Sequence, residues 1–116
     1  MEPARALADL VEISPQIDAT AVIGDDGQVV AAVGVPQARA RVLAASVRDL
    51  LEGASFRAEG RVTQVHAELE GGGVFVVGGE DARTIVAVVT GRPAPGLVFY
   101  DLKRCLALLQ GADVEA

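Results

Sequence analysis

Few residues in this chain of 116 could perform chemistry. It contains one cysteine, Cys105, and one histidine, His66, so an internal disulfide and a structural zinc site both lack ligands. Cys105 shares an apolar stripe with Leu102, Leu106 and Leu109, which is typical of a packed, unreactive thiol. His66 falls on the polar face of a predicted strand, where it is either solvated or part of a subunit contact. No second group is identifiable as its partner in acid–base catalysis.

Acidic pairs and glycine clusters supply no better catalytic or nucleotide-binding motif. Asp25 and Asp26 fall in a predicted turn, where carboxylates accept hydrogen bonds from backbone amides. Gly73 and Gly78 have the separation found in a phosphate-binding loop. However, a second glycine and then Glu80 follow where lysine and a hydroxyl residue are required. The sequence therefore predicts no enzyme active site, no metal site and no cofactor.

Charge and hydropathy exclude two further classes of function. Ten Lys and Arg residues against sixteen Asp and Glu residues give a net charge of -6, and no basic cluster interrupts this balance. Such a surface repels a phosphate backbone, so nucleic acid is not an expected partner. No apolar run reaches the roughly 18 residues of a membrane span, and the first residues lack the plan of a secretory signal. We expect a cytoplasmic protein with no membrane insertion.

The apolar periodicity predicts one domain over residues 1–116, with helices and strands in a defined order. The expected elements are a helix at 3–13, strands at 18–24 and 28–34, a long helix at 36–53, strands at 62–70, 74–77 and 84–89, a helix at 97–110, and a loose acidic tail at 112–116.

Two of these strands determine the expected architecture. Strands 74–77 and 84–89 are apolar on both faces, so each face of the sheet needs a layer of helices. Short connections make the neighbouring strands antiparallel. The predicted fold is α+β with three α/β/α layers: a five-stranded antiparallel sheet, the long helix on one face and the terminal helices on the other. Strand 62–70 is the least apolar and the best candidate for an edge.

The long helix has more than one apolar face. Its inward face is predicted from Ala40, Leu43, Ala44, Val47, Leu50, Leu51 and Ala54. Ala38, Val42 and Ala45 form a second, outward strip beside Arg41 and Arg48. Either alanine is present simply as a good helix former, or small side chains allow another helix to approach closely. Together with an exposed edge strand, the second interpretation predicts a dimer built from both elements.

The patterns of two segments resemble those of the roadblock/LC7 family, in its bacterial single-domain form. One segment runs Val-Thr-Gln-Val-His-Ala-Glu-Leu-Glu-Gly-Gly-Gly-Val-Phe-Val-Val over residues 62–77 and continues through the strand at 84–89 to residues 96–102. The other is the first hairpin, residues 17–30. The similarity covers nearly the whole chain and rests on hydrophobic pattern.

The resemblance implies a homodimer that regulates or scaffolds nucleoside triphosphatases without hydrolysing nucleotides itself. Members of the family act on dynein motors and Ras-like GTPases, and the bacterial gliding-motility member activates a small polarity GTPase. In such a dimer, the long helices pack together and the edge strands join two sheets. The matching positions here are Val65, Ala67 and Leu69 for strand pairing, Ala38, Val42 and Ala45 for helix pairing, and Arg41 and Arg48 for a surface facing the GTPase.

Other functions remain open at this point. The main alternative is a PAS- or GAF-like sensory module that binds a small molecule over its antiparallel sheet. Such modules keep one face of the sheet open, whereas helices at both termini are expected to close that face here. A small enzyme is the third alternative. The dimer is either a homodimer or a heterodimer with a sister subunit.

Overall fold

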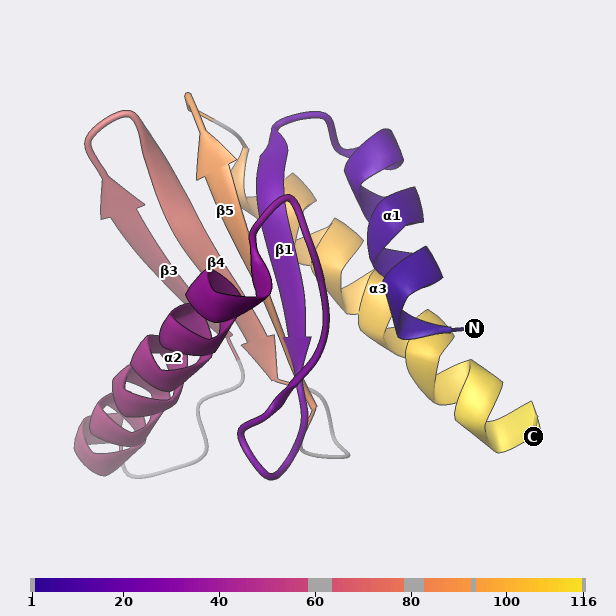
Figure 1. The fold of residues 1–116 in the computed structure, drawn as a ribbon. Coiled ribbons are helices and arrows are strands. Elements are labelled where there is room, and N and C mark those ends of the chain that lie inside the picture. Colours follow the sequence, from indigo (N-terminus) through magenta and orange to yellow (C-terminus); the bar gives the residue numbers. More distant parts are fainter. Residues whose placement is uncertain (1, 59–63, 79–82, 93, 116) are drawn as a thin grey trace.

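The computed structural model describes residues 2–58, 64–78, 83–92 and 94–115. The elements follow the predicted order along the chain (Figure 1). They are α1 (Pro3–Ile13), β1 (Ile17–Ile23), β2 (Val29–Val33), α2 (Gln37–Ala58), β3 (Gln64–Leu69), β4 (Gly72–Gly78), β5 (Thr84–Thr90) and α3 (Pro95–Glu115).

The strands form one antiparallel sheet in the order β2-β1-β5-β4-β3. β4 and β5 lie inside the sheet, and β3 forms one edge, as predicted. The sequence did not predict that β1 pairs with β5, which is distant along the chain. A buried hydroxyl helps to fix this pair, because Thr20 Oγ1 donates a hydrogen bond of 2.8 Å to the carbonyl oxygen of Val86.

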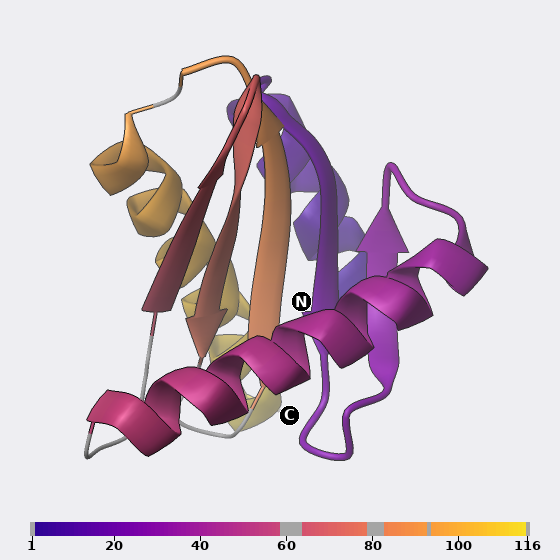
Figure 2. The ribbon, with the colours of Figure 1, turned by 90° about the vertical axis from the view of Figure 1, so that its left-hand side faces the viewer.

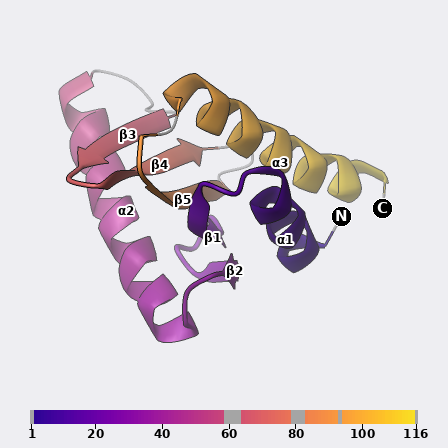
Figure 3. The same cartoon turned by 90° about the horizontal axis from the view of Figure 1, so that it is seen from above.

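Helices cover both faces of the sheet. α2 lies on one face, while α1 and α3 lie side by side on the other (Figure 3). This arrangement confirms the predicted α/β/α layering. It also places the two termini on the α1/α3 side, away from α2 (Figure 1).

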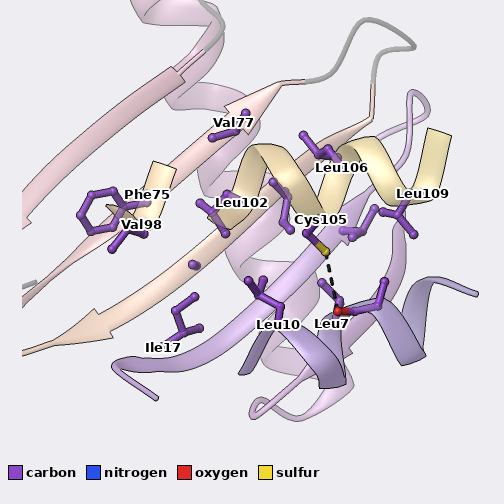
Figure 4. Close-up of a cluster of buried hydrophobic side chains, with 14 of the residues drawn as sticks. Leu7, Leu10, Ile17, Phe75, Val77, Val98, Leu102, Cys105, Leu106 and Leu109 are labelled. Carbon is purple, nitrogen blue, oxygen red and sulfur yellow. Dashed lines mark hydrogen bonds between the residues drawn. The ribbon is translucent and has the colours of Figure 1, made fainter. Parts of the chain in front are cut away.

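The layer of α1 and α3 encloses the main core (Figure 4). Its buried side chains include Leu7, Leu10, Ile17, Phe75, Ile85, Leu102, Leu106 and Leu109. Two polar contacts tie the helices together at this core. The Ser14 hydroxyl, at the end of α1, donates a hydrogen bond to the Asp101 carboxylate of α3. The Cys105 thiol lies 3.7 Å from the carbonyl oxygen of Ala6.

Glycines permit two of the hairpins. Gly27 has φ of 80° in the β1–β2 turn and Gly71 has φ of 81° in the β3–β4 turn, a conformation that other residues rarely adopt. At Gly72 the reason is space, since an added Cβ would lie 2.1 Å from the carbonyl oxygen of Val89 on β5. The predicted turns at these positions are confirmed.

Two helices extend beyond their predicted ends. α2 continues past Gly53 to Ala58, and α3 continues past Gly111 to Glu115. The prediction of a loose tail is therefore wrong for residues 112–115, and residue 116 lies outside the described residues. A glycine inside a helix lowers helix stability by about 1 kcal/mol relative to alanine, but glycine can still adopt the helical conformation. A glycine therefore does not by itself end a helix. Residues 62–63 of the predicted third strand also lie outside the described part of the chain.

Candidate functional site

The outward strip of α2 lies in solvent, as predicted. Ala38, Val42 and Ala45 are all exposed, and Val42 retains 67% of its accessible surface. The opposite face of the helix packs on the sheet through Ala44 and Val47, which are buried. The helix therefore carries apolar side chains on the face that none of the described residues covers.

One position on α2 was predicted incorrectly. The sequence placed Leu50 on the inward face, but the side chain is 41% exposed. Leu50 follows Leu43 by seven residues, so both lie on one flank of the helix. Leu43 is half-buried against the sheet, and Leu50 extends that apolar flank into solvent. The remaining inward prediction, Ala54, has a side chain outside the described residues.

The edge strand adds to the same side of the molecule. Val65 pairs with Val76 and Ala67 pairs with Val74 in the β3–β4 ladder. Because Val76 packs under α2, all these side chains point to the α2 face of the sheet. Val65 and Ala67 are half-buried. The backbone of Leu69 belongs to β3, but its side chain lies outside the described residues.

The exposed apolar side chains of α2 and the half-buried side chains of β3 lie on the same side of the sheet. Figure 2 shows α2 crossing the sheet obliquely, so that it leaves much of β3 and the adjoining part of β4 uncovered. Leu43, Val65 and Val74 belong to one cluster and link the helix to the edge strand. We call the set Ala38, Val42, Ala45, Leu50, Val65 and Ala67 the α2/β3 surface.

The two arginines lie on the other flank of α2. Arg41 and Arg48 are exposed and line a groove between the helix and the β1–β2 turn, with Asp26 and Asp49 also at its walls. Nε of Arg48 lies 3.5 Å from Oε1 of Glu52, one turn further along the helix. The structure thus brings Ala45 and the arginines together at this groove, while Val65 and Ala67 lie on the strand edge.

His66 lies away from this surface, on the opposite face of β3. It is exposed, as expected, but its ring also stacks on Phe75 with centroids 4.1 Å apart and an interplanar angle of 11°. Phe99 of α3 packs against both rings at their edges. A hollow of about 790 Å³ lies beside His66, lined mainly by glycines of the β3–β4 turn and by Glu68, Glu70 and Arg92.

Cys105 is placed as predicted for an unreactive thiol. Its side chain is 4% exposed between α1 and α3. Burial, followed by the charge of Asp9, raises the pKa of Cys105 from 9.0 to about 11. The thiolate, which is the nucleophilic form, is therefore scarce at neutral pH.

The described residues contain neither a metal-binding cluster nor a membrane-spanning helix. No group of three or more His, Cys, Asp or Glu side chains could hold a metal ion. None of the described helices combines the length and the apolar content that a membrane-spanning segment requires.

Comparison with known proteins gave matches at the level of structure. No protein-family model matches the chain, and no curated protein matches it either. Two solved roadblock/LC7 domains from Streptomyces avermitilis match it with TM-scores of 0.84 and 0.75. The first is 19% identical over 96% of this chain and 97% of its own, and the second is 22% identical over 92% and 97%.

A third solved structure is similar over almost the same length. Myxococcus xanthus MglB matches with a TM-score of 0.78 at 14% identity, covering 98% of this chain and 89% of its own. These identities are low, but the coverage is nearly complete on both sides. The helices and strands of this chain, in their order and layers, therefore adopt the roadblock/LC7 fold.

Proposed function

We propose that the protein is a non-catalytic homodimer that binds and regulates a small Ras-like GTPase. The observation that carries the proposal is the α2/β3 surface, an exposed apolar strip on a helix beside a half-covered edge strand. The roadblock/LC7 fold is compatible with GTPase regulation, and the resemblance of the sequence to that family supports the proposal.

Self-association follows from what the α2/β3 surface leaves uncovered. Val42 and Leu50 are large apolar side chains in water, and burying such area is favourable by about 25 cal/mol per Å². β3 pairs on one side only within the described sheet, so its outer edge has free backbone donors and acceptors. A second copy related by a twofold axis can cover the apolar side chains and pair with the free strand edge. Its α2 would pack against the α2 of the first copy, and its β3 would pair with the β3 of the first copy.

The GTPase is expected on the flank of α2 that carries Arg41 and Arg48. Both guanidinium groups are exposed at a groove, and this flank is not the one that bears Leu50. Ala45 of the α2/β3 surface lines the same groove, so a partner bound there would lie directly beside the dimer partner. By holding the switch segments of a GTPase in one geometry, the surface would shift the population of its conformations.

This chain itself is not expected to catalyse nucleotide hydrolysis. The thiol of Cys105 is buried and protonated at neutral pH. The guanidinium group of Arg48 already lies beside the Glu52 carboxylate, so it is not assigned to a phosphoryl group. Any effect on hydrolysis is therefore expected to come from the conformation of the GTPase.

A sensory function fits the structure less well. Helices cover both faces of the sheet, whereas a PAS- or GAF-like site requires an open face (Figure 3). The hollow beside His66 lies at the β3–β4 turn, and its lining is mostly glycine and charged residues. Small-molecule sites are mostly apolar and enclosed.

The first experiment measures molar mass in solution by light scattering. The wild type is expected to be a dimer, and Ala45→Glu is expected to weaken dimerisation by about 100-fold, because it buries an unpaired charge on the helix interface. Ala107→Glu is the matched control, since Ala107 is an exposed alanine on α3 in the opposite layer. A monomeric wild type would refute the homodimer and leave a heterodimer with a sister subunit.

The second experiment measures binding to a purified Ras-like GTPase from the same organism, loaded with GDP or with a non-hydrolysable GTP analogue. Arg41→Glu with Arg48→Glu is expected to lower the affinity at least about 10-fold while the dimer persists. Equal binding by this variant and the wild type would remove the arginine flank from the proposal. Absence of binding to every GTPase tested, with the dimer intact, would reject the regulatory function alone.

A further inference from the structure

The layer of α1 and α3 also exposes large apolar side chains. Leu97, Tyr100 and Leu108 on α3 are 54%, 61% and 46% exposed, and Ile13 at the end of α1 is 63% exposed. These residues lie on the far side of the sheet from the α2/β3 surface (Figure 3). The proposed dimer therefore leaves them in solvent.

On α3 these side chains follow one face of the helix. Leu97, Tyr100, Arg104 and Leu108 recur at intervals of three and four residues, which is the spacing of a single helical stripe. The buried stripe, with Leu102 and Leu109, points to the core on the other side of the helix. We call Leu97, Tyr100, Lys103, Arg104 and Leu108 the α3 outer face.

The Ser14–Asp101 hydrogen bond sets one boundary of this face. It joins the end of α1 to the first half of α3, so Ile13, the neighbour of Ser14, lies at the junction of the two helices. It also engages the carboxylate of Asp101, which is half-buried. The charges that α3 presents fully to solvent over residues 95–109 are accordingly those of Lys103 and Arg104.

The sign of these charges is opposite to the net charge of the molecule. The chain as a whole has a net charge of -6, yet its α3 outer face combines two exposed cations with three exposed apolar side chains. Acidic groups on α1 lie nearby: Asp9 is half-buried and Glu12 is exposed. An acidic ligand group is therefore favoured opposite Lys103 and Arg104 and disfavoured beside Glu12.

We propose that the α3 outer face is a docking site for an acidic amphipathic segment of another protein. The apolar residues of that segment would cover Leu97, Tyr100 and Leu108, as in other pairs of helices that bind through i, i+3, i+4 and i+7 anchors. Its carboxylates would pair with Lys103 and Arg104, which fixes its orientation on α3. The site lies on the opposite layer from both surfaces of the proposed function, so one molecule can hold two partners at once.

Charge argues against the other occupants of such a face. If the α3 outer face packed on its own copy, Lys103 and Arg104 would approach the same cations of the second molecule. An anionic membrane would meet two cations on a protein that carries a net charge of -6. A protein segment with apolar residues and carboxylates matches both features of the face.

Tyr100 allows a direct test. It is the only tyrosine in a chain without tryptophan, so the intrinsic fluorescence of the protein reports on this face alone. The probes are two synthetic amphipathic helical peptides without aromatic residues, one built from leucine and glutamate and the other from leucine and lysine. Only the leucine–glutamate peptide is expected to change the Tyr100 emission, with an affinity that falls as salt rises.

Charge reversal gives the decisive comparison. Lys103→Glu with Arg104→Glu is expected to weaken the leucine–glutamate peptide at least about 10-fold and to create binding of the leucine–lysine peptide. Arg41→Glu with Arg48→Glu is the matched control, because it changes the net charge equally on the opposite layer and should leave the preference of the wild type unchanged.

Three results would overturn the proposal. One is an equal response of Tyr100 to both peptides, or no response to either. Another is that the Lys103→Glu, Arg104→Glu variant, like the wild type, binds the leucine–glutamate peptide in preference to the leucine–lysine peptide. The third is a stronger response to vesicles containing phosphatidylserine than to the acidic peptide, which would assign the face to a membrane surface.

Discussion

The two helical layers bury different side chains against the same sheet. Under α1 and α3 the described core adds leucines, isoleucines and Phe75 to its valines and alanines, and Leu102 and Phe75 are fully buried. Under α2 the buried side chains are alanines, valines and Ile23. Around this second cluster, Leu43, Val65 and Val74 are only half-buried. One layer is a closed core, and the other is a thin contact with apolar margins.

This contrast separates folding from association. Large side chains that are fully removed from water provide most of the free energy of folding, so the α1/α3 layer is expected to determine stability. The small side chains under α2 contribute less free energy of folding. The half-buried side chains at the margins of this layer keep apolar area available for a second molecule. The same helix can therefore hold loosely to its own sheet and still offer a binding surface.

The largest expected effect tests the closed core. Leu102→Ala is expected to lower the free energy of unfolding by about 3 kcal/mol, because it removes buried contacts and leaves a cavity. Urea denaturation at low protein concentration measures this value. Leu108→Ala is the matched control on the same helix, since Leu108 is 46% exposed, and it should cost less than about 1 kcal/mol. Similar costs for both variants would break the comparison.

A smaller effect compares the two layers within one strand. Val86 and Val89 lie on opposite faces of β5 and are 0% and 1% exposed. Removing two carbon atoms by Val→Ala forfeits about 1.6 kcal/mol of transfer free energy at either position. We expect Val89→Ala to cost about 2.5 kcal/mol and Val86→Ala about 1.5 kcal/mol, because α2 can settle into the space that the smaller side chain leaves. A larger loss at Val86 in urea denaturation would show that α2 is packed as rigidly as the other layer.

The same contrast explains what the sequence could predict. The α1/α3 layer follows from strong periodicity: the stripe of Leu102, Leu106 and Leu109 and the strands apolar on both faces define the core and the layering. α2 is rich in alanine, which fits either side of a helix, so its periodicity separates the inward from the outward face poorly. Leu50 was misplaced for this reason.

Contacts between distant segments were not predictable from local pattern. β1 and β5 pair although they lie in opposite halves of the chain. The residue pattern of either strand is equally compatible with pairing to another strand of the sheet. The Ser14–Asp101 hydrogen bond and the stacking of His66 on Phe75 also depend on that tertiary arrangement. Residue type alone identified His66 as unusual but gave no position for its ring.

The pH dependence of the free energy of unfolding tests whether water reaches the closed core. Because the pKa of Cys105 is raised from 9.0 to about 11, the fold favours the neutral thiol. Its contribution to stability is complete below about pH 9 and is lost as the pH rises towards about 11. Wild type should therefore lose more stability than Cys105→Ala between these values, as measured by urea denaturation across the range. Parallel losses would mean that water reaches the thiol.

The smallest expected effect on folding tests the open margin. Val42 is 67% exposed, and serine has nearly the helix propensity of valine, so Val42→Ser should change the free energy of unfolding of the monomer by less than about 0.5 kcal/mol. Its effect on association should be visible in the thermal midpoint. If the α2/β3 surface is buried between two copies, the midpoint of the wild type rises with protein concentration, and that of Val42→Ser rises less. A loss of monomer stability as large as that of Val86→Ala would instead show that Val42 already belongs to the folded core, and the distinction between the two layers would fail at α2.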